Sequence, residues 1–333
     1  MKKILILTLL IAVNALIFSA CGKQRTDVEN STTTGNSTTL ENTGTEVATS
    51  PESEETEVET SATTITYQSE NGPIEVPAEP KRVVVLNSFI SGTVMSLNVN
   101  IVGIDSWAMA NPLYEPYLKD ATEVSDENIE LILELEPDLI IAASNNNNID
   151  KLNQIAPTVT YTYGNVDYLT QIQEVGKLLN KEEEAKVWVD DFKARAKSAG
   201  EEIRKKIGED ATVSVMEMFD KQLYVYGDNW GRGTEILYQE MKLNMPETVK
   251  NTALKAGYYA ISPEVFSDYA GDYIIYSKSS SADHSFQETE SYKNIPAVKN
   301  NQIFEFDASI FYFNDPITLN YQLEMFIQSF LGN

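Results

Sequence analysis

Residues 180–208 read NKEEEAKVWVDDFKARAKSAGEEIRKKIG, with no proline, acidic residues early and basic residues late. This order of charges suits a helix, whose dipole favours acids at its start and bases at its end. Five apolar residues recur at helical spacing: Ala185, Trp188, Val189, Phe192 and Ala196. The stretch therefore predicts one continuous helix over residues 180–207, longer than the average of about twelve residues in globular proteins.

Short apolar runs alternate with helical patterns before this stretch. The runs are VVVL (83–86), NIVGID (100–105), PDLIIAAS (137–144) and PTVTYTY (157–163). Continuous runs of this kind suit strands buried on both faces of a parallel sheet. Helices are expected over residues 89–97, in SDENIELILEL (125–135) and over about 167–179. In the second of them Ser125 or Asp126 can cap the start, and Ile129, Ile132 and Leu133 share one face.

The strand pattern restarts after the long helix. It comprises ATVSVMEMF (211–219), QLYVYG (222–227) and DYIIYS (272–277), and an amphipathic helix, DPITLNYQLEMFIQSFL (315–331), follows near the end. Such alternation is typical of the α/β class. We expect two Rossmann-like α/β lobes, residues 64–179 and 208–333, with a cleft between them. A single long helix joining the lobes implies a stiff connection and cleft walls that move little.

The N-terminal region predicts export. Lys2 and Lys3 precede an apolar run over residues 4–18, and small residues precede the only cysteine, Cys21. We expect a signal peptide over residues 1–20. The sequence SACGK is similar to a bacterial lipobox, which implies an acylated Cys21, such as a palmitate-bearing one, and a lipid-anchored protein. The alternative is a signal peptide without lipidation.

Residues 22–63 contain no aromatic side chain and are dominated by Ser, Thr, Asn and Glu. A segment of this composition buries too little apolar surface to offset its ordering entropy. We therefore expect residues 21–63 to be a disordered tether between an anchored Cys21 and the folded part. A long tether fits the outer face of the cell membrane in a Gram-positive, single-membrane cell.

Composition argues against some functions and gives little support to others. The formal net charge of −25 argues against nucleic acid, whose phosphates are bound by basic surfaces. His284, the only histidine, lies in the polar loop SSSADHSFQ, where we expect it to be solvated. A zinc site or a Ser-His-Asp triad needs more partners, so no catalytic residue and no metal site is assigned. Hydrolysis by two carboxylates stays open, because an acidic chain offers many candidates.

The stretch LYVYGDNWGRGTEIL (223–237) places Trp230 and Arg232 between glycines, where a strand gives way to a helix. A phosphate-binding Walker loop is not predicted, because that motif needs a Lys followed by Ser or Thr. The loop at the end of a strand is where open α/β sheets bind ligands. Two interpretations remain: Trp230 and Arg232 face a ligand, or Trp230 packs on the neighbouring lobe and Arg232 pairs with an acidic side chain.

Several stretches, in this order and spacing, resemble the substrate-binding proteins of bacterial ABC importers in the iron-siderophore class. They are PKRVVVLN (80–87), NIELILELEPDLIIA (128–142), VGKLLNKEEEAKVW (175–188), GRGTEIL (231–237), AVKNNQIFEF (297–306) and NDPITLNYQLEMF (314–326). The resemblance covers about residues 80–331. It implies a class III periplasmic-binding-protein-like fold and a monomer without enzyme activity, which serves an ABC permease and its ATPase.

Within that class, YVYGDNWGRG (224–233) is similar to lipoproteins that bind ferric hydroxamate siderophores such as ferrichrome and ferrioxamines. The six hydroxamate oxygens already surround the iron, so the protein would coordinate no metal and need no cofactor. Arg232 would donate to these oxygens, and Trp230 and Tyr224 would supply stiff apolar surfaces. Further pocket residues are expected at Trp107, Asn145, Tyr163, Phe311 and Tyr312.

The resemblance also implies residues that dock to the permease, and it leaves the identity of the ligand open. Glu130 and Glu264 occupy the positions of one glutamate per lobe that pairs with arginines of the permease; alternatively, each is an acid placed to suit a helix start. Haem, cobalamin and a ferric catecholate are alternative ligands. An extracellular hydrolase is the alternative from another class.

Overall fold

The computed structural model describes residues 64–332. The predicted signal peptide, Cys21 and the tether over residues 21–63 lie outside these residues. Within residues 64–332, no helix is both long enough and apolar enough to cross a membrane.

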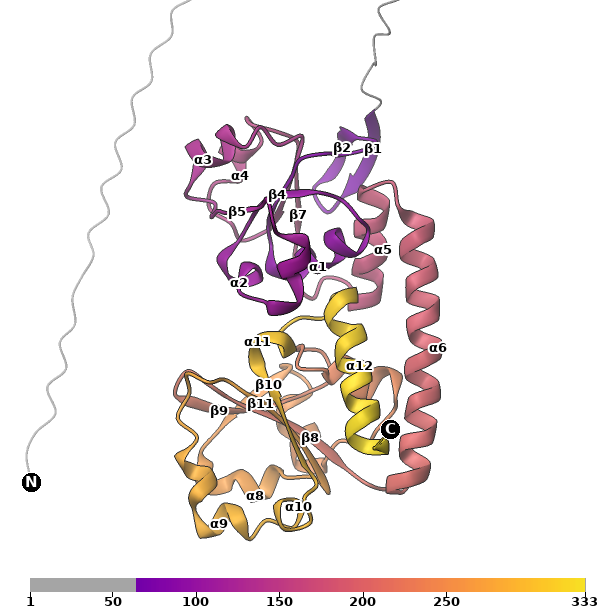
Figure 1. The fold of residues 1–333 in the computed structure, drawn as a ribbon, viewed down its shortest axis with the longest axis vertical. Helices are drawn as coiled ribbons and strands as arrows, with labels where there is room; N and C mark the ends of the chain where they lie inside the picture. The colour runs from indigo at the N-terminus through magenta and orange to yellow at the C-terminus, as the bar shows by residue number, and fades with distance from the viewer. Residues whose placement is uncertain (1–63, 333) are drawn as a thin grey trace, which may run out of the picture. The chain divides into compact units, whose positions relative to one another are not determined.

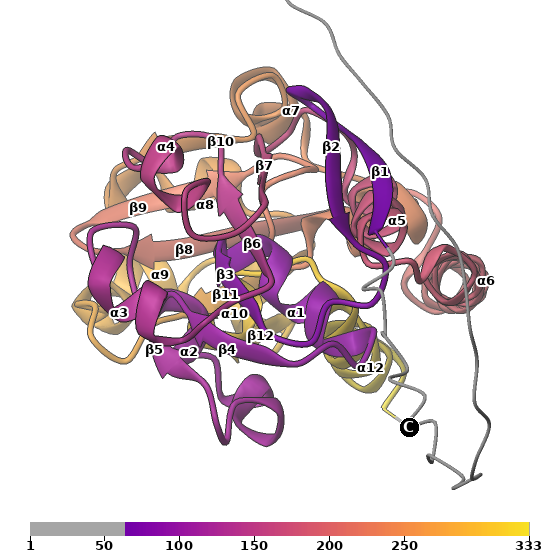
Figure 2. The ribbon, with the colours of Figure 1, turned by 90° about the horizontal axis from the view of Figure 1, so that it is seen from above.

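The first lobe is built on a parallel sheet of five strands in the order β5-β4-β3-β6-β7. The strands are β3 (Val83–Leu86), β4 (Ile101–Ile104), β5 (Thr122–Glu123), β6 (Leu139–Ala143) and β7 (Thr158–Tyr161). The helical segments are α1 (Ser88–Ser96), α2 (Ser106–Met109), η1 (Pro112–Tyr117), α3 (Ile129–Glu134), α4 (Ile149–Leu152) and α5 (Tyr168–Leu178). An antiparallel hairpin, β1 (Thr64–Ser69) and β2 (Gly72–Pro77), lies beside α5 (Figure 2). Strands β3 and β7 are buried along their whole length, as their apolar runs predict.

Two details of α3 differ from the sequence prediction. The helix begins after Asn128, and neither Ser125 nor Asp126 caps it. The Asp126 carboxylate instead accepts the backbone N–H of Asn147 at 2.8 Å, which ties the loop before α3 to the loop before α4. Leu133 was expected on the buried face but is 58% exposed, because the short helix buries only Ile132 fully.

The second lobe has a mixed sheet of five strands in the order β10-β9-β8-β11-β12. The strands are β8 (Val213–Phe219), β9 (Gln222–Tyr226), β10 (Tyr258–Ile261), β11 (Tyr273–Lys278) and β12 (Ile303–Asp307). Strands β8, β11 and β12 are parallel, while β9 and β10 run antiparallel to their neighbours. The helical segments are the π-helix η2 (Glu235–Glu240), α7 (Glu247–Ala253), η3 (Pro263–Val265), α8 (Phe266–Tyr269), η4 (Ser285–Glu288), α9 (Glu290–Lys293), α10 (Pro296–Lys299), α11 (Ala308–Phe311) and α12 (Pro316–Leu331).

Helix α6 (Glu182–Ile207) joins the lobes and runs along both of them, as Figure 1 shows. Its 26 residues span about 39 Å at 1.5 Å per residue. The buried stripe of the helix begins at Ala185 and ends at Ile203, and it contacts α5, η2 and α12. The predicted fold class, two α/β lobes joined by one long helix, is confirmed.

A second connection between the lobes crosses at the start of α12. The Tyr114 hydroxyl of the first lobe donates to the Asp315 carboxylate at 2.5 Å, and both side chains are fully buried. Burial raises the pKa of Asp315, and its hydrogen bonds to Thr318 and Tyr114 offset this only in part. This buried bond therefore links the lobes in addition to α6.

Substitution of Gly200 on α6 is expected to change the stability of the protein. A Cβ at this position would lie 2.5 Å from the Cα of Met241 in the second lobe, a backbone atom that cannot swing aside. The higher helix propensity of alanine is worth about 1 kcal/mol, whereas overpacking costs about 1–3 kcal/mol and here meets backbone. Gly200→Ala is expected to lower the free energy of unfolding in urea. The exposed Ser198→Ala variant, which adds helix propensity without a clash, should not lower it.

Candidate functional site

A cavity of about 360 Å³ lies between the lobes, within the range of small-molecule sites. Eight of its nine lining residues are aromatic. The first lobe contributes Phe89, Trp107 and Tyr163, and the second contributes Phe219, Tyr224, Tyr226, Trp230, Arg232 and Tyr258. The site therefore offers ring faces from both sides and one cation.

The first-lobe wall is formed where parallel strands end. Phe89 follows β3, Trp107 follows β4 and Tyr163 follows β7, so their loops meet at the carboxyl edge of one sheet. The Asp105 carboxylate accepts the backbone N–H of Trp107 at 3.0 Å and caps α2. The ring centroid of Phe89 lies 5.7 Å from that of Trp107 and 4.7 Å from that of Tyr163. The three rings thus form one continuous surface.

The second-lobe wall comes from β9, β10 and the loop after β9. Tyr224 and Tyr226 are two residues apart on β9, so they share one face of the strand. Tyr258 pairs directly with Tyr226 across β10 and β9. The ring centroid of Trp230 lies 4.9 Å from that of Tyr258 and 5.4 Å from that of Tyr163 in the first lobe. Trp230 therefore lines the cavity and also contacts the opposite lobe.

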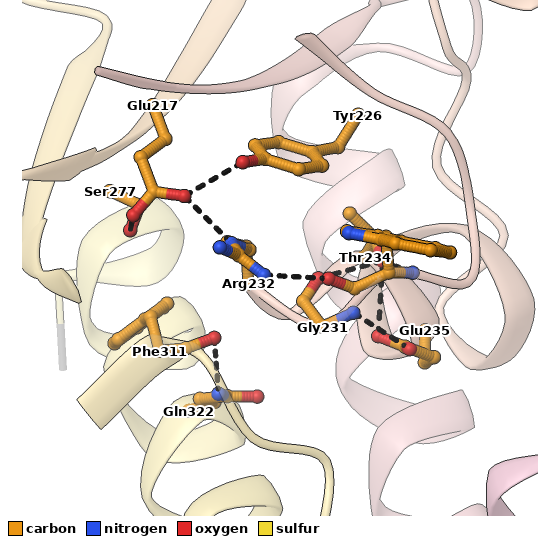
Figure 3. Close-up of polar contacts among 10 residues, drawn as sticks. Glu217, Tyr226, Gly231, Arg232, Thr234, Glu235, Ser277, Phe311 and Gln322 are labelled. Atoms are coloured by element: carbon orange, nitrogen blue, oxygen red, sulfur yellow. Dashed lines mark hydrogen bonds and ion pairs between the residues drawn. The ribbon is translucent and has the colours of Figure 1, made fainter. Parts of the chain in front are cut away.

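The loop that carries Arg232 has an unusual backbone. Gly231, Arg232 and Gly233 have φ values of 68°, 58° and 78°, all in the left-handed region that favours glycine. The Arg232 N–H donates to the Phe311 carbonyl at 2.6 Å. The Gly231 N–H donates to the Glu235 carboxylate at 2.9 Å (Figure 3). For a residue with a Cβ, such as Arg232, the left-handed conformation costs about 1–2 kcal/mol. These two hydrogen bonds hold Arg232 in it.

The Arg232 side chain is only 6% exposed and is held by specific partners. Its Nε donates to the Glu217 carboxylate at 2.8 Å, and its Nη1 donates to the Trp230 carbonyl at 3.2 Å. The rings of Tyr226 and Tyr312 lie at 4.8 and 4.7 Å from its Cζ. Burial alone would lower the pKa of Arg232, but Tyr226 and Glu217 outweigh burial and the pKa is raised. The guanidinium therefore stays charged.

The tyrosines around this guanidinium are neutral donors near pH 7. Burial, followed by the charge of Glu217, raises the pKa of Tyr312 to about 12. Burial also raises the pKa of Tyr226 and of Tyr163. Their hydroxyl groups can therefore donate hydrogen bonds to oxygen atoms of a ligand.

The structure places most, but not all, of the predicted site residues at this cavity. Trp230, Arg232, Tyr224, Trp107 and Tyr163 line it. Tyr312 does not line it but contacts two residues that do: its ring centroid lies 4.7 Å from Cζ of Arg232 and 5.4 Å from the ring centroid of Trp107.

Asn145 and Phe311 do not line the cavity. Asn145 is exposed in the turn after β6, where Asn146 folds back to accept the Ala143 N–H at 2.7 Å. Phe311 is 1% exposed and stacks on Phe306 at 4.6 Å, so it contributes its carbonyl to Arg232 while its ring belongs to the core. Neither side chain is therefore where the sequence placed it, at the aromatic cavity.

Sequence reasoning missed four lining residues and one residue behind the wall. Phe89, Phe219, Tyr226 and Tyr258 line the cavity, and Glu217 is fully buried against Arg232. One signal was available for Glu217, because it is a charged residue inside the apolar run VSVMEMF. Tyr226 could have been inferred from its position two residues after Tyr224 on the same strand face.

A larger and more polar hollow of about 590 Å³ adjoins the aromatic cavity and shares Tyr163 with it. Its other lining residues include Asp167, Asp228, Glu235 and Glu240. Stacking surfaces and the guanidinium converge at the smaller cavity and not at this hollow. Size alone does not identify a binding site.

His284 is not simply solvated, as its sequence context predicts. It is half-buried; its Nδ1 lies 3.0 Å from the Tyr276 hydroxyl and its Nε2 lies 2.7 Å from the Ser279 carbonyl. The ring thus orders the loop after β11. In the part of the chain covered by the structure, no three His, Cys, Asp or Glu side chains are grouped so that they could hold a metal ion.

Comparison with known proteins adds independent information. Residues 83–310 match the protein family described as "Periplasmic binding protein". The iron(3+)-hydroxamate-binding protein FhuD of Bacillus subtilis (strain 168) is 36% identical over 274 residues, 80% of this chain and 87% of that protein. The iron(3+)-hydroxamate-binding protein YxeB of the same organism is 34% identical over 269 residues, 78% of this chain and 83% of that protein.

Solved structures give the same picture. FhuD2 of Staphylococcus aureus with bound ferrioxamine B is similar with a TM-score of 0.72 and 35% identity, over 76% of this chain and 99% of that chain. The FhuD protein of S. pseudintermedius is similar with a TM-score of 0.74 and 34% identity, over 81% of this chain and 99% of that chain.

Proposed function

We propose, from the premise that this chain belongs to the periplasmic binding protein family, that it captures a ferric hydroxamate siderophore and delivers it to an ABC importer. The resemblance noted in the sequence is thereby confirmed at the level of the family. Members of this family bind substrates for import, so the proposal includes no chemical conversion of the ligand.

One observation carries the choice of ligand: eight aromatic residues and one guanidinium converge on a cavity between the lobes. A ferric trihydroxamate presents iron already surrounded by oxygens, within an organic backbone of largely apolar character. The ring faces suit that backbone, and N–H and O–H donors from Arg232 and the tyrosines suit the partly anionic oxygens. The names of the two Bacillus subtilis relatives support the same class of ligand.

A ligand panel tests this proposal directly. The purified chain is titrated with ferrioxamine B, ferrichrome, a ferric catecholate, haem and cobalamin, and quenching of tryptophan fluorescence is followed. Trp107 and Trp230 line the cavity and serve as reporters. Tightest binding of a trihydroxamate supports the proposal, whereas tightest binding of another panel member overturns it.

The proposal extends to the location of the protein. A signal peptide over residues 1–20 and an acylated Cys21 would anchor the folded part to the outer face of the cell membrane through a tether. Metabolic labelling with an alkyne-bearing palmitate, comparing the natural chain with a Cys21→Ala variant, tests this anchor. Loss of label in the variant is the expected result, and label in both proteins contradicts it.

Docking to the permease is assigned to Glu130 and Glu264. Glu130 is exposed in the first turn of α3 of the first lobe, and Glu264 is exposed in η3, just before α8 of the second lobe. Helices α3 and α8 both lie on the side of the molecule away from α6 (Figures 1 and 2). A hydrogen bond from Ser262 lowers the pKa of Glu264, which keeps it ionised. The two carboxylates can therefore meet cationic side chains of one partner.

The double variant Glu130→Ala, Glu264→Ala is expected to bind the ligand with unchanged Kd and to lose most of the uptake of radioactive iron supplied as the siderophore complex. Uptake is measured in cells that lack the natural gene and carry the variant. Glu183→Ala, Glu202→Ala, which removes two exposed acids from α6, is the matched control. Normal uptake by the first variant would remove the docking role.

A further inference from the structure

We infer that Glu217 is a specificity-determining residue: it neutralises the guanidinium at the cavity, so that the site favours electrically neutral iron complexes over anionic ones. This inference rests on the proposed function. It concerns the charge of the ligand, which the aromatic lining does not decide.

Glu217 stands behind the cavity wall on β8 and is 0% exposed. Its carboxylate accepts from Arg232 Nε at 2.8 Å, from the Tyr226 hydroxyl at 2.8 Å and from the Ser277 hydroxyl at 3.2 Å (Figure 3). It is not among the residues that line the cavity. Glu217 therefore acts on a ligand through Arg232 and through its charge.

The charges around the cavity decide its preference. Arg232 is the one charged residue among the nine that line the cavity, and a buried carboxylate lies 2.8 Å from its Nε. At this distance, and with both groups buried, the two charges largely cancel for a ligand farther away. The guanidinium thus offers hydrogen-bond donors without a net positive charge.

The neighbouring hollow adds no net positive charge to the site. Its lining includes Lys242 but also the acids Asp167, Asp228, Glu235 and Glu240. An anionic complex that enters the cleft loses its hydration and meets four acids against one lysine in this lining.

The net charge of the iron complex differs between the two classes of siderophore, hydroxamates and catecholates. Three hydroxamate groups carry one negative charge each and balance the three positive charges of Fe³⁺, so the complex core is neutral. Three catecholates carry two negative charges each and leave a net charge of minus three. Burying a charge without a partner is costly, so the compensated site favours the neutral core.

The test is the isosteric variant Glu217→Gln, which leaves Arg232 uncompensated. Calorimetric Kd values are measured for ferrichrome, a neutral trihydroxamate, and for ferric enterobactin, a trianionic catecholate. The ratio of the two Kd values is expected to shift at least tenfold toward the anionic complex. The shift should shrink at 0.5 M salt, because salt screens charges.

Glu247→Gln is the matched control, since Glu247 is exposed on α7 and its loss changes the net charge equally. An unmoved ratio in Glu217→Gln, or an equal shift in Glu247→Gln, overturns the inference. Thermal melting shows whether each variant is folded. If Glu217→Gln does not fold, the double variant Glu217→Gln, Arg232→Gln decides. It carries no net charge at these two positions and should keep the wild-type ratio, so a gain in catecholate binding overturns the inference.

The wild-type measurement separates this inference from the proposed function. Failure of the natural chain to bind any trihydroxamate overturns the proposed function. Trihydroxamate binding by the natural chain together with an unmoved ratio in the variant overturns only the role of Glu217.

Discussion

Trp230→Ala is expected to weaken the binding of ferrioxamine B or ferrichrome at least tenfold. The indole lines the cavity and packs against Tyr258 and Tyr163, so its removal deletes a stacking surface and the contact between the two walls. Truncation of such an anchor typically costs about 2 kcal/mol or more, which is more than a tenfold change in Kd.

Calorimetry is the appropriate measurement for this variant, because Trp230 is itself a fluorescence reporter. Trp230→Phe should recover part of the affinity, since it keeps a ring face. Trp188→Phe, which changes an indole on α6 that stacks on Phe192 and does not line the cavity, should bind like the natural chain. Unchanged binding by Trp230→Ala would place the ligand elsewhere.

Arg232→Ala is expected to have the largest effect on stability, lowering the free energy of unfolding by about 3–5 kcal/mol. The physical reason is Glu217, which would remain fully buried without its cationic partner. Alanine keeps a Cβ at the same positive φ, so the backbone strain at this position is unchanged by the substitution. Urea unfolding, followed by circular dichroism, measures the loss.

The double variant Arg232→Met, Glu217→Gln separates the two explanations of that loss. It removes both charges. The amide oxygen of the substituted side chain can accept from one of the two hydroxyl groups that now donate to separate carboxylate oxygens, Tyr226 or Ser277, and its NH2 group can donate to the other. Most of the lost stability should return, although ligand binding should stay at least tenfold weaker than in the natural chain. A double variant as unstable as Arg232→Ala would show that the guanidinium stabilises by packing and not by charge.

Sequence patterns were sufficient to predict an element where the local periodicity is compatible with only one type of secondary structure. The continuous apolar runs at 83–86 and 139–142 correspond to buried parallel strands, and the uninterrupted helical pattern at 180–207 corresponds to α6. Trp230 and Arg232 could be singled out because glycines on both sides mark a backbone conformation that ordinary residues avoid.

The pattern was insufficient where residues distant in sequence come together. Asn145 and Phe311 stand beside predicted loops, but a turn directs one to solvent and core packing buries the other. The partner of the loop residue Arg232 lies fifteen residues earlier, on strand β8, and a single sequence carries no sign of that pairing. Of the two interpretations of the Trp230 and Arg232 loop, the structure shows the second, since Trp230 packs on Tyr163 of the first lobe and Arg232 pairs with Glu217. Contact with a ligand stays a prediction, at a cavity that both residues line.

The sequence by itself determined the two α/β lobes, the helix that joins them and the loop that presents Trp230 and Arg232. These features follow from hydrophobic period, charge order and glycine placement, which act over neighbouring residues. Only the tertiary structure decided which rings from both lobes share one cavity and which carboxylate compensates the guanidinium. Those facts depend on how strands from separate parts of the chain pack against one another, and local periodicity does not encode that arrangement.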